Sequence, residues 1–217
     1  MHKASGESTT SLVAVRFYRD DDLEQGSHPW RAWRRSVIGA SEAPTIMNEN
    51  PWAKVQRLRE EKLGLRPEFT GNAATREGQA LEPHARAAAS AYLGVDLEPA
   101  IAQSALHLFI AASLDGIDAT SNTLVEIKCG VKSYAESDTT GRVPRYYWAQ
   151  LQHQLMVTQL HLLHYVAYRP ERPLIVIPVH RDAEYIQRML EAELRFADTL
   201  RSEGHRFQNA PRGTPVH

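Results

Sequence analysis

Two carboxylates and a lysine are the residues of this chain whose types and spacing could do chemistry together. Glu126 and Lys128 flank Ile127 in a segment that we expect to be a strand, so their side chains share one face of the sheet. Asp115 lies eleven residues before Glu126 and is followed by Gly116, a turn signal. If the two segments pair as a hairpin, both carboxylates meet at one end of the sheet.

Such a group is suited to metal-assisted hydrolysis of a phosphodiester. Carboxylate and carbonyl oxygens are the ligands that Mg²⁺ prefers. A bound divalent ion can activate water and stabilise charge on a phosphate, and a nearby lysine can orient that water or neutralise the transition state. The triplet alone is a weak signal, because an ion pair on a solvated strand face has the same residues. The preceding Asp-Gly dipeptide strengthens it.

A second triplet and a third carboxylate have to be weighed. The triplet Glu60-Glu61-Lys62 lies in an expected surface helix, where a spacing of two does not bring side chains together, so we leave it out of the site. Glu82 could supply a third carboxylate from the following long helix. Glu77 is its competitor on a different face of that helix, and either could be an ordinary helix residue.

The elements that must position these residues follow from the spacing of apolar side chains. We expect strands at residues 13–18, 101–110, 123–129, 164–168 and 174–179. We expect helices at residues 30–35, 41–47, 52–63, 72–93, 144–160 and 183–202, with Ser41 as an N-cap and a polar loop at 130–142. This order predicts an α/β (α+β) fold with a small mixed central sheet flanked by helices.

Composition sets the broad class. The chain has 217 residues, 42% of them apolar, which suits one domain over residues 15–217 after a flexible N-terminus at 1–14. The single cysteine, Cys129, excludes an intramolecular disulfide, and no apolar run is long enough to span a membrane, so we expect a cytoplasmic protein. A net charge of −1 excludes a uniformly basic surface but not a local basic channel.

The order of five motifs resembles phage lambda exonuclease and its relatives, the YqaJ-type viral recombinases of the PD-(D/E)xK nuclease superfamily. They are Val37-Ile38-Gly39-Ala40-Ser41-Glu42, Gly78-Gln79-Ala80-Leu81-Glu82-Pro83, Ser113-Leu114-Asp115-Gly116, Leu124-Val125-Glu126-Ile127-Lys128-Cys129 and Ala149-Gln150-Leu151-Gln152-His153-Gln154. Together they cover about residues 30–170. The commonest family form has proline where Leu114 stands, but proline is no metal ligand and the chemistry should survive.

The resemblance implies a specific activity. The family has a restriction-endonuclease-like core and digests linear double-stranded DNA from the 5′ end with Mg²⁺, leaving a 3′ single strand. The resemblance further implies two Mg²⁺ ions, for which Mn²⁺ can substitute, and a homotrimeric ring around DNA. It implies work with a single-strand annealing protein in homologous recombination, and no membrane.

The resemblance also assigns roles to residues. Asp115 and Glu126 match the metal ligands, together with the carbonyl of Ile127; Glu82 matches the helical acid near the second metal and Lys128 the catalytic lysine. The positions that hold the 5′-phosphate are matched by Arg34, Ser41, Ser113 and Gln150. An arginine with hydroxyl and amide donors is a reasonable phosphate clamp, and a helix start at Ser41 would add N–H groups.

Several alternatives stay open. Arg35 is the neighbouring alternative to Arg34, and Gln154 shares a helix face with Gln150. His153 could be a further donor, although a packed or surface histidine is favoured, and a core role is favoured over a DNA wedge for two tryptophans, Trp30 and Trp33. A site-specific or flap endonuclease with the same core is the nearest rival function. A DNA-binding protein with a decayed site is the other, and the presence of all four candidate catalytic side chains argues against it.

Overall fold

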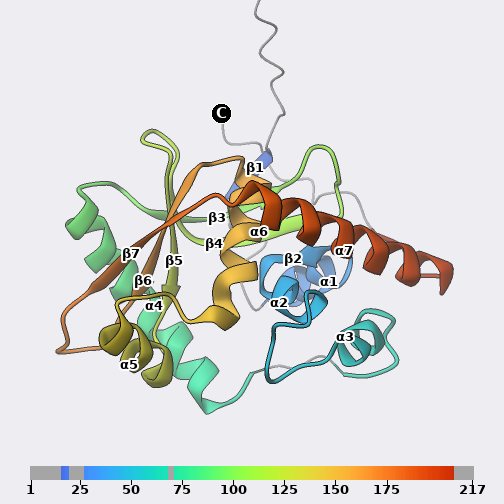
Figure 1. Cartoon of the computed structure of the whole chain (residues 1–217), viewed down its shortest axis with the longest axis horizontal. Helices are drawn as coiled ribbons and strands as arrows, with labels where there is room; N and C mark the ends of the chain where they lie inside the picture. The colour runs from blue at the N-terminus through green and yellow to red at the C-terminus, as the bar shows by residue number, and fades with distance from the viewer. Residues whose placement is uncertain (1–15, 20–26, 68–70, 208–217) are drawn as a thin grey trace, which may run out of the picture.

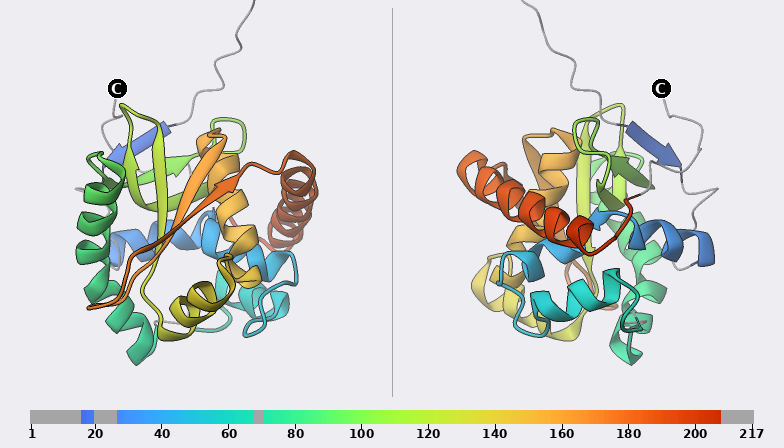
Figure 2. Two further views of the ribbon diagram at one scale, coloured as in Figure 1. Left: turned by 60° about the vertical axis from the view of Figure 1, so that its left-hand side comes forward. Right: turned by 90° about the vertical axis from the view of Figure 1, so that its right-hand side faces the viewer.

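The architecture is a mixed sheet with helices on both faces, as Figures 1 and 2 show. The computed structural model describes residues 16–19, 27–67 and 71–207. The predicted flexible segment at 1–14 lies outside these residues. The mixed sheet flanked by helices confirms the predicted fold class, although seven strands make the sheet larger than the small one expected.

The two central strands of the sheet carry the candidate catalytic residues. The strands along the sheet are β1 (Arg16–Arg19), β3 (Glu98–Gln103), β4 (Ile110–Asp118), β5 (Thr123–Lys128), β6 (Leu162–Ala167) and β7 (Ile175–His180), and β2 (Ile38–Gly39) pairs with β4. Neighbours along this path are antiparallel except for β5 and β6, which are parallel. The crossover between β5 and β6 is helical, as is usual for a parallel connection.

Helices cover the sheet unequally. They are α1 (His28–Arg35), α2 (Ala43–Ile46), α3 (Val55–Lys62), α4 (Ala73–Leu93), α5 (Val131–Thr140), α6 (Trp148–Thr158) and α7 (Ala183–Ser202), with 3₁₀ turns η2 (Ala40–Glu42) and η3 (Arg145–Tyr147). In Figure 2, α4 lies on one face while α6 and α7 lie on the other. Two apolar clusters match these layers: Leu151 and Leu155 of α6 belong to the larger, and Ala85 and Ala89 of α4 to the smaller. Among the described residues, no helix is long and apolar enough to cross a membrane.

A buried polar residue fixes α6 in place. His153 is fully buried, and its Nδ1 lies 2.7 Å from Glu193 of α7 while its Nε2 lies 2.9 Å from the carbonyl of Ala111 in β4. Burial disfavours the imidazolium, but the carboxylate of Glu193 outweighs burial and raises the pKa of His153. His153 is therefore a packed histidine, as favoured from the sequence, and Trp30 and Trp33 are likewise buried in the core.

Four predictions of local structure were wrong. Residues 130–142 form helix α5 instead of a polar loop, because its buried positions are Ser133, Tyr134 and Ser137, which give no apolar periodicity. The strand expected at 101–110 is interrupted after Gln103, and β4 begins only at Ile110. Asp115 therefore lies inside a strand instead of a turn. Ser41 is not an N-cap, since it lies within the 3₁₀ turn η2.

Candidate active site

The hairpin of β4 and β5 brings the first carboxylate to the second strand. The two strands pair from Asp118 and Thr123 to Gly116 and Val125. At the next position, Asp115 Oδ2 accepts the backbone N–H of Ile127 at 2.8 Å, in place of a strand-to-strand hydrogen bond. Asp115 is thus held against the Glu126–Lys128 segment, as the hairpin hypothesis required.

The glycine after Asp115 serves close packing. A Cβ atom at Gly116 would lie 2.8 Å from Cγ2 of Val125 and 3.2 Å from Cβ of Leu97. The first contact is too short for two carbon atoms and the second is tight, so a larger residue at this position would force Val125 and its strand to shift. The Asp-Gly dipeptide was correctly singled out, but the reason is close strand packing and not a turn.

Glu126 lies at the centre of the site and is 1% exposed. Its Oε1 accepts hydrogen bonds from Nζ of Lys128 at 2.5 Å and from Nε2 of Gln150 at 2.5 Å. Its Oε2 accepts Nε2 of Gln154 at 2.5 Å. Both glutamines of α6 therefore donate hydrogen bonds to Glu126. The helix face that carries them points to this buried acid and not to solvent.

On the long helix, Glu82 and not Glu77 lies close enough to interact with Asp115 and Glu126. Glu77 instead forms an ion pair with Arg169 at 2.7 Å. Glu82 Oε1 accepts Nη2 of Arg86 at 2.6 Å, and Nε of the same arginine donates to the backbone carbonyl of Asp115. Arg86 thus ties α4 to β4. Sequence reasoning missed it, although its position four residues after a candidate acid was an available signal.

The charges of the site act on one another. Burial, and next the negative charge of Glu126, raise the pKa of Asp115 well above its usual range, while Lys128 and the Ile127 N–H oppose this rise. Burial also raises the pKa of Glu82, with a smaller contribution from Glu126. The three carboxylates therefore lie close enough to repel one another, and a cation among them would relieve the repulsion.

The same carboxylates favour the charged form of Lys128. Burial disfavours its charged form, but the carboxylates of Glu126 and Asp115 outweigh burial and raise the pKa of Lys128. Its Nζ also lies 4.8 Å from the ring centroid of Tyr147, a neighbour that the sequence did not indicate. In the absence of a bound cation, Lys128 is thus held as an ammonium group that can donate hydrogen bonds.

The donor set fits a hard divalent cation. Asp115, Glu126, Glu82 and the Ile127 carbonyl offer only oxygen atoms, the preference of Mg²⁺. Within the described part of the chain, no three acidic, histidine or cysteine side chains are already arranged as metal ligands. Glu82 is instead paired with Arg86 and Glu126 with Lys128. Each carboxylate keeps lone pairs beyond these contacts, so both remain able to bind a cation.

A second polar group lies on the turn between α1 and η2. Arg34 Nη2 donates to Oγ of Ser41 at 2.7 Å, and the guanidinium lies 5.0 Å from the ring of Trp30. Arg34 is thus the arginine of the pair 34–35 that contacts the predicted serine. Ser113 lies on β4 two residues before Asp115. In the described residues, no hydrogen bond joins the Arg34–Ser41 pair to Ser113 or Gln150.

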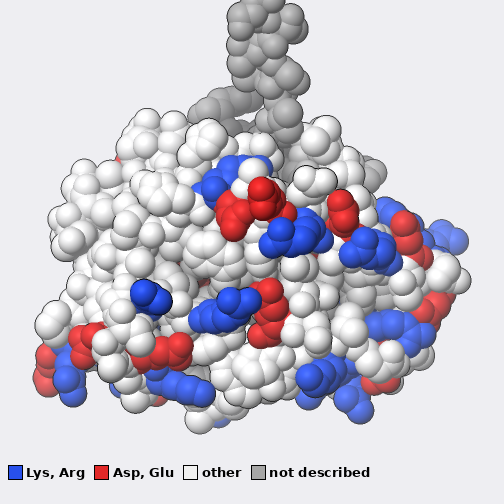
Figure 3. All heavy atoms as spheres, viewed as in Figure 1, with Lys and Arg blue, Asp and Glu red and all other residues white. Residues whose placement is uncertain are grey.

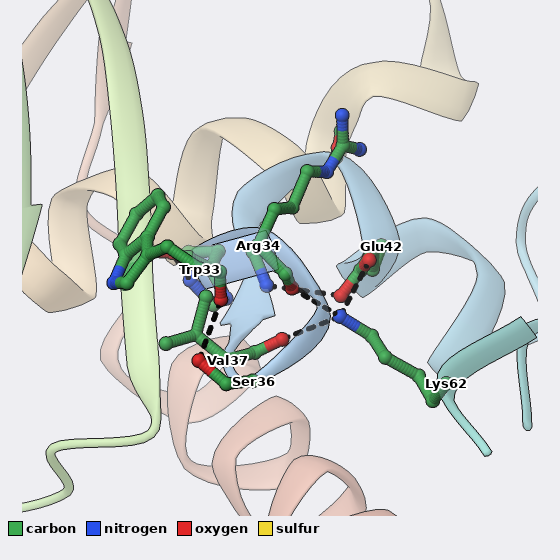
Figure 4. Close-up of polar contacts among 10 residues, drawn as sticks. Trp33, Arg34, Ser36, Val37, Glu42 and Lys62 are labelled. Carbon is green, nitrogen blue, oxygen red and sulfur yellow. Dashed lines mark hydrogen bonds and ion pairs between the residues drawn. The ribbon is translucent and has the colours of Figure 1, made fainter. Parts of the chain in front are cut away.

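Lys62 holds the main chain between Arg34 and Val37, as Figure 4 shows. Lys62 was expected on a surface helix, but it is 5% exposed, because its ammonium group finds oxygen partners inside the protein. Its Nζ donates to the carbonyls of Arg34 at 2.8 Å and Val37 at 2.5 Å, and lies 2.8 Å from Oε1 of Glu42. Glu42 Oε2 in turn accepts the N–H of Gly39 at 3.0 Å. Lys62 therefore fixes the main chain that carries Arg34, while the guanidinium points away from it.

The charged surface shows no single-sign field on the face in Figure 3. Lysine and arginine side chains lie next to aspartate and glutamate along the lower rim and over α7. This interspersion agrees with the net charge of −1. General electrostatic attraction to DNA is therefore weak on this face, and specific contacts have to hold a nucleic acid.

Comparison with known proteins decides the family. The model of the YqaJ-like viral recombinase domain matches residues 29–161, which include every candidate site residue. The chain belongs to this family. Among curated proteins, no sequence matches it.

Solved structures agree with membership of the YqaJ-like family. The alkaline exonuclease of Laribacter hongkongensis (LHK-Exo), also solved in complex with dAMP, is 26% identical with a TM-score of 0.72, over 82% of this chain and 94% of that one. A phage-related exonuclease of Haemophilus somnus is 16% identical with a TM-score of 0.54, over 77% and 96% of the two chains, and shares the fold. These matches confirm the class predicted from the sequence: the chain is a nuclease that acts on DNA.

Proposed function

We propose that this chain is a Mg²⁺-dependent exonuclease that digests linear double-stranded DNA from the 5′ end. The 3′ single strands that it leaves would serve homologous recombination by single-strand annealing. The observation that carries the proposal is the convergence of Asp115, Glu126 and Glu82 around Lys128. Membership of the YqaJ-like family and the similarity to an alkaline exonuclease support it.

Asp115, Glu126, Glu82 and the Ile127 carbonyl would hold the ions. When bound, Mg²⁺ lowers the pKa of water and offsets negative charge on the phosphate. The acids of the chain are suited to this role because burial and mutual repulsion disfavour their charged forms in the absence of a cation. Mn²⁺, which also accepts oxygen ligands, is expected to substitute.

Lys128 would act on the reacting phosphate, and Gln150 would contact the 5′-phosphate. Lys128 stays an ammonium group because of Glu126 and Asp115, so we assign it the donation of hydrogen bonds to oxygens that gain charge. Gln150 gives one amide hydrogen to Glu126, and an amide group has two. The second is available for a phosphate oxygen beside the carboxylate.

The Arg34–Ser41 pair is the proposed receptor for the terminal 5′-phosphate. A guanidinium matches phosphate oxygens in a forked geometry, and a hydroxyl adds another donor. Lys62 supports this role because it fixes the carbonyls of Arg34 and Val37. Ser113, two residues from Asp115, would complete the pocket on the strand side.

A ring-shaped homotrimer and a single-strand annealing partner extend the proposal. The net charge of −1 supports a ring, because a closed ring retains DNA by topology where electrostatic affinity is low. A ring predicts many cleavages per encounter with a long duplex. One cleavage per encounter would remove the support for it.

The test uses a linear duplex with a 5′-phosphate and a distinct label at each end of one strand. Wild-type protein in Mg²⁺ is expected to release the 5′ label first and keep the 3′ label on a progressively shorter strand, whereas EDTA and the Asp115→Ala variant stop the reaction. Internal cuts, or digestion of a covalently closed circle, would instead favour an endonuclease. Binding without any cleavage would favour a protein that only binds DNA.

A further inference from the structure

A chain of aromatic rings leads from the candidate catalytic lysine to the protein surface. The ring of Tyr147, beside Lys128, lies 4.6 Å from that of Tyr146. The ring of Tyr146 lies 4.8 Å from that of Trp52 in an edge-to-face arrangement. Trp52 is 63% exposed, so it presents a large apolar surface to solvent close to the active site.

The segment that carries Trp52 is fixed by its own hydrogen bonds. Asn50 Oδ1 accepts the backbone N–H groups of Trp52 at 2.9 Å and Ala53 at 3.2 Å. Asn50 Nδ2 donates to Oγ1 of Thr45 at 2.9 Å, and its backbone N–H donates to the carbonyl of Pro44 at 3.0 Å. These hydrogen bonds fix the loop that exposes the ring of Trp52. Trp30 and Trp33, in contrast, are buried.

A positive charge lies beside the exposed ring. Lys132, on the first turn of α5, places its Nζ 5.5 Å from the ring centroid of Trp52. Lys132 lies four residues after Lys128 in the sequence and is itself exposed. An exposed aromatic ring with a lysine ammonium over it is a combination suited to single-stranded nucleic acid, since a base can stack on the ring and the cation attracts phosphate.

We propose that Trp52 and Lys132 form a subsite for one nucleotide of single-stranded DNA, next to the catalytic group. A base of the substrate stacks on Trp52, and the adjoining phosphate pairs with Lys132. Because every base has an aromatic face, the subsite is tolerant of sequence, as repeated digestion of one strand requires. The inference rests on the proposed nuclease function for its biological meaning but not for its test.

The test measures binding of a short fluorescein-labelled oligothymidylate by anisotropy in EDTA, where no cleavage occurs. Trp52→Ala is expected to weaken binding about 5- to 150-fold, which is the loss of one stacked base, whereas Trp52→Phe keeps an aromatic face and stays within about threefold of wild type. Lys132→Met is expected to reduce the slope of log affinity against log salt by about 0.7, one phosphate contact. In Mg²⁺, Trp52→Ala should raise KM and leave kcat near wild type.

Tyr92→Ala is the matched control. Tyr92 is 65% exposed in the last turn of α4, ten residues and therefore roughly 15 Å along the helix from Glu82. Wild-type affinity in Trp52→Ala, or an equal loss in Tyr92→Ala, would overturn the subsite. Loss of binding in Trp52→Ala with a wild type that never cleaves would sink the exonuclease proposal and leave the subsite standing. Normal cleavage by the wild type, together with unaltered binding by Trp52→Ala, would overturn the subsite and leave the exonuclease proposal standing.

Discussion

Two lysine–glutamate pairs of this molecule use the same chemistry for different ends. All three donors of the Lys62 ammonium are used by oxygens of Arg34, Val37 and Glu42, and its side chain is 3% exposed. Lys128 gives one donor to Glu126 in the described part of the chain, and its side chain is 20% exposed. A lysine whose donors are all taken holds the fold, whereas one that keeps donors near buried acids is available to a substrate.

The largest expected effect on stability comes from breaking the Lys62 pair. Lys62→Met leaves Glu42 buried without its cation and the carbonyls of Arg34 and Val37 without a donor. The free energy of unfolding, measured in urea, should fall by about 3–5 kcal/mol. The double variant Lys62→Met/Glu42→Gln should recover part of this loss. A single variant as stable as wild type would show that the pair is not structural.

Removing a charge from the candidate catalytic acids should increase stability instead of lowering it. Asp115→Asn keeps an acceptor for the Ile127 N–H and removes one of three repelling carboxylates, so in EDTA its Tm should rise by about 2–4 °C, or about 1 kcal/mol. The folded state raises the pKa of Asp115, so wild type loses stability as the pH rises from the unfolded value near 4 through the folded value. The difference should therefore be absent below about pH 4 and grow above it. A loss of stability in Asp115→Asn at pH 7 would contradict the repulsion.

The smallest expected effect concerns the phosphate receptor. Ser41→Ala removes the hydroxyl that contacts Arg34 and leaves the Lys62 scaffold intact. The preference for 5′-phosphorylated over 5′-hydroxyl ends should fall about fivefold, the value of one hydrogen bond. Competition between the two duplexes measures this ratio directly. An unchanged ratio would show that Ser41 does not contact the terminal 5′-phosphate.

The contrast between the lysines also shows what the sequence could predict. The strand carrying Glu126 and Lys128 and the long helix with Glu82 were predicted, because apolar spacing and Gly94 mark them. The buried role of Lys62 could not be predicted, since its partners are main-chain carbonyls brought close only by the tertiary fold. The same reason hid Tyr147, which contacts Lys128 from another element.

Helix α5 was missed for a different reason. Its buried face consists of Ser133, Tyr134 and Ser137, so it lacks the apolar stripe by which helices are found. Gly116 was read as a turn residue because close packing against Val125 and a turn both call for glycine. The choice between Glu82 and Glu77 likewise needed the position of Arg86 and Arg169.

The most direct test of the catalytic group is the single-turnover rate of Lys128→Met on a 5′-phosphorylated linear duplex in Mg²⁺. The rate of the first cleavage should fall about 10²–10³-fold, as for the loss of one preorganised donor, with the end preference kept. The Lys62→Met/Glu42→Gln variant should show the reverse pattern: near-normal cleavage of 5′-hydroxyl ends and a reduced preference for 5′-phosphate. Cleavage by Lys128→Met at the wild-type rate would contradict the assignment of the active site.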